Sequence, residues 1–326
     1  MKRFLLLAFL TITVFSGCDN EIELTADYKT IPIIYAFVDP DADSNFIRVE
    51  KAFLGEGNAI ELANNPDSIF FEDVTVMLTR ADNQTFELER IDGNTIGRPR
   101  QDGLFAGTPN WLYLLEESVA NVRPNERIRI EVLQNEEVLG SATTTLVGGG
   151  RIITPNEVIN FSERSDTRVS YDLAPSTGMI GLNLEFFYAE TNSQGNFVPK
   201  SVSWQIENDA IIANNQTRGT YEFDGTRFYQ FLQGALDEDA GIQRRTRFVS
   251  LELISVGREL REVRDIQLAN QGITGSQELP VYTNVNNGRG IVSSRSFLQI
   301  DSLALSNLTR DSIVFGRFTR DLNFLN

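Results

Sequence analysis

The chain contains no histidine and only one cysteine, Cys18. Without histidine, the sequence excludes Ser-His-Asp and Cys-His catalysis and any metal site that depends on imidazole ligands. A single cysteine cannot form an intramolecular disulfide or a cluster of thiolate ligands. We therefore expect no cofactor, and these residue types nominate no catalytic group.

Basic residues are also scarce, with 29 Lys and Arg against 45 Asp and Glu, for a formal net charge of −16. A strongly acidic surface repels the phosphate backbone of nucleic acids and does not favour adhesion to anionic lipid. We expect no nucleic-acid partner. Membrane attachment would have to depend on something other than surface charge.

The one extended apolar segment is Phe4–Phe15, which follows Lys2 and Arg3. A transmembrane helix needs about 20 apolar residues, so this segment is too short to span a bilayer. A short basic region followed by an apolar region of this length is typical of a secretory signal. The sequence therefore predicts an exported protein.

The end of this segment is typical of a bacterial lipoprotein signal. Ser16 and Gly17 are small and stand directly before Cys18, and in such signals the cysteine is acylated and becomes the new N-terminus. We expect residues 1–17 to be removed as a signal peptide and residues 18–24 to form a lipidated tether at the outer membrane. The alternative is an ordinary secretory signal, which would remove Cys18 or leave it as a free thiol.

Residues 19–23 place three acidic side chains directly after the expected anchor. This resembles the acidic tether of surface-exported lipoproteins in Bacteroidota, and it favours the cell surface over the periplasmic face. The alternative is a solvated tether whose acids contribute only to solubility.

From Tyr28 onward the pattern is that of short β-strands. Ile31–Val38 is an apolar run suited to a buried strand, and Arg127–Val132 alternates as a strand with one buried face does. Similar segments separated by turn signals lie at 46–51, 74–79, 86–89 and 138–147. The fold class is therefore mostly β, and residues 25–147 are expected to form an antiparallel domain of immunoglobulin-like size.

Gly148–Gly150 forms a natural boundary, because three consecutive glycines are difficult to order. The alternative is a wide loop inside a single domain. Residues 151–326 are expected to form a second β-rich, sandwich-type part with about two helices. Its predicted strands lie at 182–188, 198–206, 248–256, 297–303 and 313–318.

Two segments of the second half have helical spacing. Phe228, Phe231, Leu232 and Ala235 would share one helical face after an N-cap at Asp224. The second helix is expected over Gly257–Gln271, with Leu260, Val263 and Ile266 facing inward. The first stripe is better explained by core packing than by ligand binding.

Asp39, Asp41 and Asp43 are the metal-ligand candidates with a recognisable spacing, and they are weak ones. Together with Glu50 they match positions 1, 3, 5 and 12 of a calcium-binding loop. Position 6 should be glycine and is Ser44, and Glu50 lies in an alternating strand. A solvated turn explains the same residues better.

Other acidic and aromatic residues give weaker signals. Asp237–Asp239 is best explained as a solvated loop, although three carboxylates could hold a hard cation. Trp111 and Tyr113 are candidates for an exposed aromatic patch that binds a ligand, with core packing as the alternative. Gly148–Gly150 lacks the Lys-Ser/Thr pair of a phosphate-binding loop.

The segment from Pro280 to Val292 carries an ordered series of turn residues: Pro280, Tyr282-Thr283-Asn284, Asn287-Gly288 and Gly290-Ile291. This series resembles the C-terminal signature of a family of Bacteroidota outer-membrane lipoproteins whose domain has no known function. Arg289 stands where that family usually has leucine. The segments 32–35 and 51–57 also agree with the family.

The resemblance implies a two-part β fold, a lipid anchor at Cys18 and genomic proximity to TonB-dependent receptors. It supplies no catalytic residue. Two function classes remain: a non-catalytic module that binds a small molecule or glycan or assists a TonB-dependent transporter, and a glycan-active enzyme that uses carboxylates. The missing histidine favours the binding module, and a purely structural envelope role is a third alternative.

Overall fold

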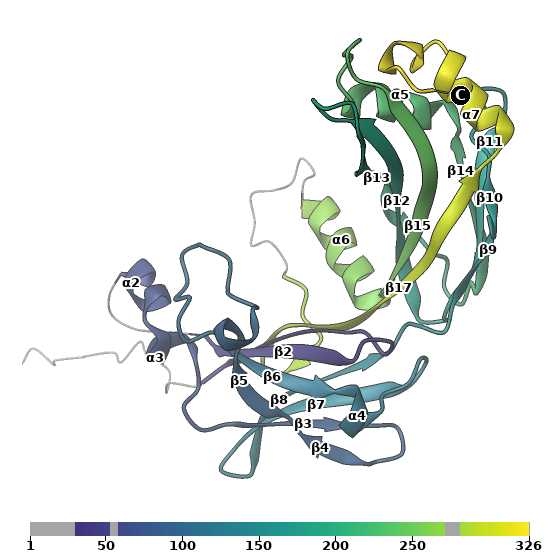
Figure 1. The fold of residues 1–326 in the computed structure, drawn as a ribbon. Coiled ribbons are helices and arrows are strands. Elements are labelled where there is room, and N and C mark those ends of the chain that lie inside the picture. The colour runs from purple at the N-terminus through teal and green to yellow at the C-terminus, as the bar shows by residue number, and fades with distance from the viewer. Residues whose placement is uncertain (1–29, 53–57, 271–280, 326) are drawn as a thin grey trace, which may run out of the picture. The chain divides into compact units, whose positions relative to one another are not determined.

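The computed structural model describes residues 30–52, 58–270 and 281–325, and Ile31–Asn326 cluster as one compact unit. The fold is mostly β, in several sheets joined by short helices (Figure 1). No helix among the described residues has the length and apolarity to cross a bilayer.

The first half contains β1 (Pro32–Val38), β2 (Ser44–Lys51), α2 (Ala59–Asn64), α3 (Pro66–Ile69), β3 (Thr75–Thr79), β4 (Thr85–Glu87), β5 (Glu89–Asp92), η1 (Gly93–Ile96), β6 (Trp111–Glu116), α4 (Glu117–Ala120), β7 (Arg127–Gln134) and β8 (Glu137–Thr145). The second half contains β9 (Arg151–Thr154), β10 (Val158–Ile159), β11 (Asp166–Asp172), β12 (Thr177–Thr191), β13 (Phe197–Ile211), β14 (Arg218–Asp224), α5 (Thr226–Ala235), β15 (Arg244–Gly257), α6 (Arg258–Asn270), β16 (Val285–Asn286), β17 (Arg289–Leu305), α7 (Asn307–Phe315) and η2 (Arg320–Leu322).

The largest sheet has nine strands in the order β13-β12-β15-β17-β1-β2-β6-β5, with β10 beside β17. β17 joins its two parts. Residues 289–294 pair in parallel with β1, and residues 295–303 pair antiparallel with β15. The first and last strands among the described residues are therefore neighbours in one sheet.

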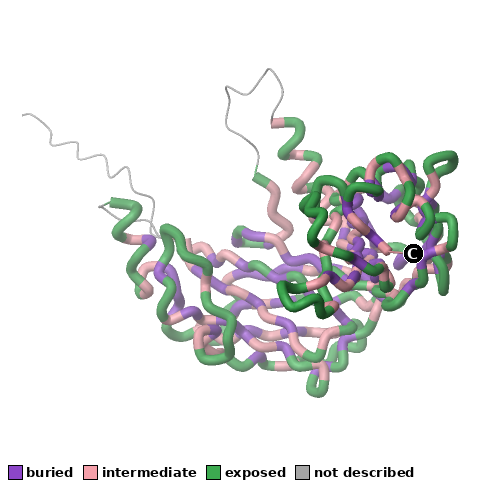
Figure 2. Tube along the Cα trace, turned by 45° about the horizontal axis from the view of Figure 1, so that its top comes forward, coloured by how far each residue is buried: buried purple, intermediate pink, exposed green. Residues whose placement is uncertain are grey.

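The first hydrophobic core lies between β1, β2 and β6 of this sheet and the five-stranded sheet β16-β8-β7-β3-β4. Alternation along each strand sends every second side chain into it, as in the β7 residues Ile128, Ile130 and Val132. Figure 2 shows buried and less buried positions following one another along these strands. This part is a β-sandwich.

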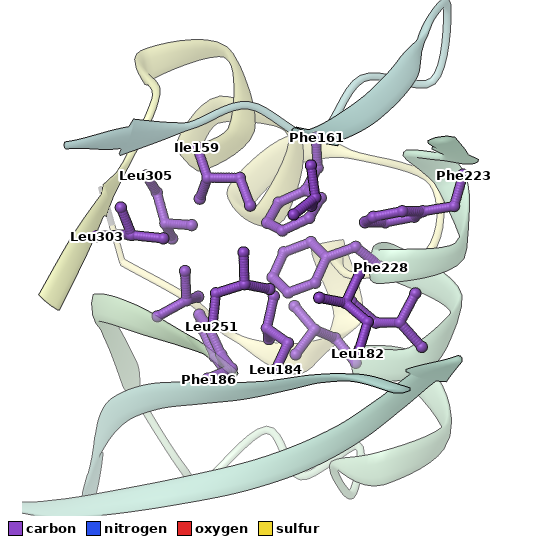
Figure 3. Packing of buried hydrophobic residues seen from close by; sticks show 14 of the residues in the cluster. Ile159, Phe161, Leu182, Leu184, Phe186, Phe223, Phe228, Leu251, Leu303 and Leu305 are labelled. Atoms are coloured by element: carbon purple, nitrogen blue, oxygen red, sulfur yellow. The ribbon is translucent and has the colours of Figure 1, made fainter. Parts of the chain in front are cut away.

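The second core lies between β13, β12, β15 and β17 and the three-stranded sheet β14-β11-β9, with α5 and α7 contributing. Phe161 and Phe228 stack at its centre, with ring centroids 4.0 Å apart. Leu182, Leu184 and Phe186 face them from β12 (Figure 3). This aromatic-rich cluster gives the second half its own core.

Gly148–Gly150 lies between the two cores in the sequence, but a later segment of the chain also contributes to the first core. Val285 and Val292 belong to the first core, so the segment around β16 returns to the first half. Gly148 is buried, and a Cβ there would lie 2.8 Å from Pro40 Cγ. The independence of the two halves stays a prediction.

The predicted strand at 313–318 is wrong, because residues 307–315 form α7. The side chain of Ser306 caps this helix by accepting a hydrogen bond from the backbone N–H of Thr309 at 3.1 Å. Thr309 and Ile313 are buried four residues apart on one helical face. The β-branched pair Ile313-Val314 favoured the wrong prediction.

Both predicted helices are present, with corrections to their ends and faces. Gly225, not Asp224, is the N-cap residue of α5, although the Asp224 carboxylate accepts a hydrogen bond from Thr226 N at 2.8 Å. Ala235 is exposed. None of the residues of α6 is fully buried, so its expected inward face, Leu260, Val263 and Ile266, is only half-buried.

Candidate functional site

The expected anchor lies outside the described residues, as do Cys18 and the whole of residues 1–24. The same holds for Pro280 and residues 53–57 of the segments that carry the family resemblance. The signal peptide, the lipidation and the tether therefore stay predictions.

The Asp39 turn is held together by its own hydrogen bonds. The carboxylate of Asp39 accepts from Asp41 N at 3.0 Å, and the side chain of Asn45 both accepts from Asp39 N and donates to Asp39 O. Asp41 also accepts from Ser296 Oγ at 3.2 Å. Burial raises the pKa of Asp39. These carboxylates build a turn against β17, as an Asx-turn does.

Glu50 does not contribute to this turn. It lies at the far end of β2 and forms ion pairs with two arginines there. Among the described residues, no group of three potential ligands is placed to hold a metal ion. Asp239 in the second acidic run accepts from Gly241 N at 2.7 Å and forms an exposed turn.

Trp111 and Tyr113 do not form an exposed patch. Tyr113 is buried in the first core. Trp111 is half-buried against a small cluster of Ile69, Phe70 and Ala106, and the guanidinium of Arg90 lies 4.5 Å from its ring centroid. Both residues pack in cores, which was the alternative to a binding role.

A hollow of about 370 Å³ lies on the outer face of β1 and β2, on the side of the sheet opposite the first core. It is lined by Ile33, Tyr35, Arg48, Glu50, Lys51, Ile69, Arg100 and Phe105, and we call it the arginine hollow. Strand register creates it, because Ile33 pairs with Glu50 and Tyr35 pairs with Arg48. Tyr35 keeps 42% of its surface exposed.

Two arginines share one carboxylate oxygen in this hollow. Arg100 Nη1 lies 2.8 Å from Glu50 Oε1, and Arg48 Nη1 lies 3.2 Å from the same atom. The Glu50 side chain is 9% exposed, and the arginine side chains are 17% and 23% exposed. One carboxylate cannot neutralise two guanidinium groups, so this half-buried group of three side chains keeps a net positive charge.

The arginines are also positioned by their neighbours. Arg48 Nη2 donates to Asn110 Oδ1 at 2.8 Å, and Asn110 in turn donates to Arg98 O and to Asp92. Arg100 lies over the ring of Phe105, 4.7 Å from its centroid. Burial lowers the pKa of Arg48, and the charge of Arg100 lowers it further, against the opposing effect of Glu50.

This arrangement has the chemistry to bind an anion. Guanidinium forks recognise carboxylate and phosphate in bidentate geometry, and aromatic walls pack against the apolar part of a ligand. Lys51 adds a third cationic residue to the lining. The arginine hollow is therefore the best candidate functional site of the described residues.

Sequence reasoning missed this site. The alternation around β2 places Arg48 and Glu50 on one face, which was visible in the sequence. Arg100, however, comes from the loop after η1, 50 positions from Glu50. No local pattern brings it to β2.

The residues of the C-terminal signature have a structural role. Asn284 Nδ2 donates to Val292 O at 2.7 Å, and Val292 N donates to Asn284 Oδ1 at 3.0 Å. Gly290 has a φ of +111°, and a Cβ there would collide with Ile34 O. The Asn284 hydrogen bonds connect the segment at β16 to β17, and the missing side chain of Gly290 lets β17 lie close to β1.

No model of a known protein family matches the chain, and no curated protein matches it. The C-terminal globular domain of an oligosaccharyltransferase from Pyrococcus abyssi is similar over 69% of this chain and 47% of its own, with 10% identity and a TM-score of 0.24. The tetra-tandem repeat in the extending region of a large adhesion protein is similar over 84% and 49%, with 11% identity and a TM-score of 0.20. This chain thus spans about half of each, and TM-scores this low support no argument about function.

Proposed function

We propose that the protein is a lipid-anchored outer-membrane lipoprotein on the cell surface that binds an anionic small molecule or glycan and catalyses no reaction. The observation that carries the binding proposal is the sharing of Glu50 Oε1 by Arg48 and Arg100 inside a hollow with aromatic walls. A ligand carboxylate or phosphate would supply the negative charge that Glu50 alone does not.

The net charge of the molecule opposes the approach of an anionic ligand. The net charge of −16 repels anions at long range. At physiological ionic strength the Debye length is about 8 Å, so this repulsion is largely screened beyond that distance. Binding then depends on short contacts with the guanidinium groups, which suits a small or flexible anionic ligand better than a large polyanion.

The test is a calorimetric titration of the full chain with oligogalacturonate and, separately, with inorganic phosphate. We expect at least one of these anions to bind, and Arg100→Ala to weaken binding about tenfold or more, because a hydrogen bond to a charged group is lost. Arg168→Ala is the matched control, since Arg168 is 69% exposed and pairs with Glu222 on another sheet. Absence of binding by both anions, or equal loss in the control, contradicts the proposal.

The non-catalytic part has its own test. Released reducing sugar is measured beside retention on immobilised polysaccharides. Turnover that disappears on replacement of one specific Asp or Glu would contradict the proposal and support the alternative, a carboxylate-dependent glycan-active enzyme.

The membrane part is tested at Cys18. Cys18→Ser is expected to release the protein from the membrane fraction or to leave it unprocessed, because stable anchoring depends on the acyl chains. Normal processing with unchanged fractionation would contradict the lipid anchor. Co-purification with a TonB-dependent receptor from gently solubilised outer membranes would support the transporter-accessory form of the proposal.

A further inference from the structure

The long strands of the second half have an outer face that differs from their inner face. Leu182, Leu184 and Phe186 of β12 point into the second core (Figure 3). Asn183 and Glu185 alternate with them and therefore lie on the opposite face. Strands β13, β15 and β17 alternate in the same way, and the outer face carries polar side chains from all four strands.

Strand register arranges these polar side chains in two rows. The first row runs Gln205, Asn183, Glu252 and Gln299 across β13, β12, β15 and β17. The second row runs Ser203, Glu185, Ser250 and Asp301, because Glu185 pairs with Ser203 and with Ser250, and Ser250 Oγ lies 3.2 Å from Asp301 Oδ1. We call these two rows the polar platform.

A hollow of about 420 Å³ lies on the polar platform, lined by Asn183, Leu184, Glu185, Ser203, Trp204, Gln205, Ser250, Glu252 and Gln299. None of these lining residues is cationic. Asn183 Nδ2 donates to Glu252 Oε2 at 2.9 Å, which orients both side chains. Within the described part of the chain, the side chains of Glu185, Ser203 and Gln205 form no hydrogen bond. The hollow therefore presents acceptors and donors that are free to bind a ligand.

Aromatic residues lie beyond both ends of the platform. Phe187 and Phe248 pair directly next to the second row, and their rings stack at 4.5 Å. Phe297 pairs with Ile254 next to the first row and is 41% exposed. Consecutive rows lie about 7 Å apart along the strands, so the aromatic ends are separated by about 20 Å. This length suits an extended ligand more than a compact one.

We propose that the polar platform is a second binding site, independent of the arginine hollow, and that it takes a neutral oligosaccharide. Sugar hydroxyls donate to the carboxylates of Glu185 and Glu252 and accept from the amide of Gln205, and the terminal aromatic rings pack against the C–H faces of the sugars. Inside the hollow the carboxylates face no cationic lining residue and repel an acidic sugar, whereas Arg247 and Arg295 lie over the rings of Phe248 and Phe297 at the two ends of the platform. The two sites therefore select different ligands, an anion in the arginine hollow and a neutral sugar on the polar platform.

The test is a calorimetric titration of the full chain with maltohexaose, cellohexaose and laminarihexaose, with spermidine as a cationic probe. We expect at least one of the sugars to bind, and the double variant Glu185→Ala/Gln205→Ala to weaken that binding at least about tenfold. The double variant Gln233→Ala/Glu238→Ala is the matched control, because both residues are exposed outside the platform. Arg100→Ala is also expected to leave binding of the neutral sugar unchanged.

Circular dichroism spectra of the variants establish that each one is folded. The proposal is overturned if none of the three sugars binds at millimolar concentration, or if the control variant loses as much affinity as the platform variant. It is also overturned if only spermidine binds, since the platform would then be a cation site. Failure of the anion titration at Arg48 and Arg100 leaves these outcomes unaffected, so the two proposals fail separately.

Discussion

At the scale of single residues, Glu50 has two opposing effects. It partly neutralises Arg48 and Arg100, which stabilises the folded chain, and it occupies the guanidinium groups that an anionic ligand would use. Removal of its charge should therefore change stability and affinity in opposite directions. A role in packing alone would change stability only.

Glu50→Gln is expected to lower the free energy of unfolding by about 1–3 kcal/mol, because two half-buried guanidinium groups lose their counter-charge. The same variant should bind phosphate or oligogalacturonate more tightly than the parent. Urea denaturation and calorimetric titration measure the two effects. Glu222→Gln, at a carboxylate 45% exposed, is the control and should stay within about 0.5 kcal/mol. Weaker anion binding in Glu50→Gln would contradict the arginine hollow.

The lowered pKa of a second carboxylate, Glu190, allows a prediction of how the free energy of unfolding depends on pH. Burial alone would raise its pKa, but hydrogen bonds from Lys200 at 2.6 Å and Arg244 at 3.0 Å lower it below the ordinary value of 4.5. Because the folded pKa is below the unfolded one, the stabilisation is complete above about pH 4.5 and is lost as the pH falls through the folded value.

Glu190→Gln should therefore be less stable than the parent at pH 7, and the difference should shrink below pH 4.5. Chemical denaturation at a series of pH values measures this. Arg244 is 2% exposed and also donates to Leu322 O at 2.8 Å, so the effect extends to the C-terminal turn. A difference that is constant down to pH 3 would rule out the linkage.

At the scale of elements, the side chains of Thr283 and Asn284 link the segment at β16 to β17, and Asn284 makes two of the hydrogen bonds. Asn284 imitates a strand residue, since it both donates to and accepts from the backbone of Val292. Asn284→Asp keeps the acceptor but places a carboxylate oxygen against Val292 O. We expect a loss of about 1–3 kcal/mol in unfolding free energy. Asn286→Asp adds the same charge at an exposed position and should cost less than about 0.5 kcal/mol, as thermal denaturation of both variants would show.

Element types followed from local pattern in several strands with one buried face, although β11 (Asp166–Asp172) has the same alternating burial and was not predicted. The alternation at 127–132 predicted β7, and the apolar run at 31–38 predicted β1. Prediction failed at α7, where Ile313-Val314 favours a strand but the Ser306 cap and the four-residue spacing of Thr309 and Ile313 produce a helix. Local propensity is weak where capping and tertiary packing oppose it.

The candidate site was harder to predict from the sequence than the fold. Asp39, Asp41 and Asp43 suggested a metal site because of their alternate spacing, yet Asp39 caps its own turn and Asp41 accepts a hydrogen bond from Ser296 of β17. The arginine hollow depends on Arg100 reaching Glu50 from a distant loop. The polar platform likewise depends on register between strands, which no single segment specifies.

At the scale of the whole molecule, β17 belongs to both sandwiches. Its first residues pair with β1, and its later residues pair with β15. We expect a single thermal transition, because neither core can lose its part of β17 without disturbing the other. Scanning calorimetry measures this, with a calorimetric to van't Hoff enthalpy ratio near 1 for a cooperative unit. Two separate transitions would instead support independent halves divided at Gly148–Gly150.

The pairing of β1 with β17 also sets the order in which the chain can fold. Val38 and Ser294 form a hydrogen bond although they are 256 positions apart. Closing so large a loop carries an entropic cost that the first sandwich cannot recover until β17 is available. During synthesis from the N-terminus, β1 therefore has an open strand edge until β17 has emerged. An unpaired apolar edge of this kind favours aggregation, so we expect slow folding of the newly synthesised chain and a requirement for a chaperone that shields β1.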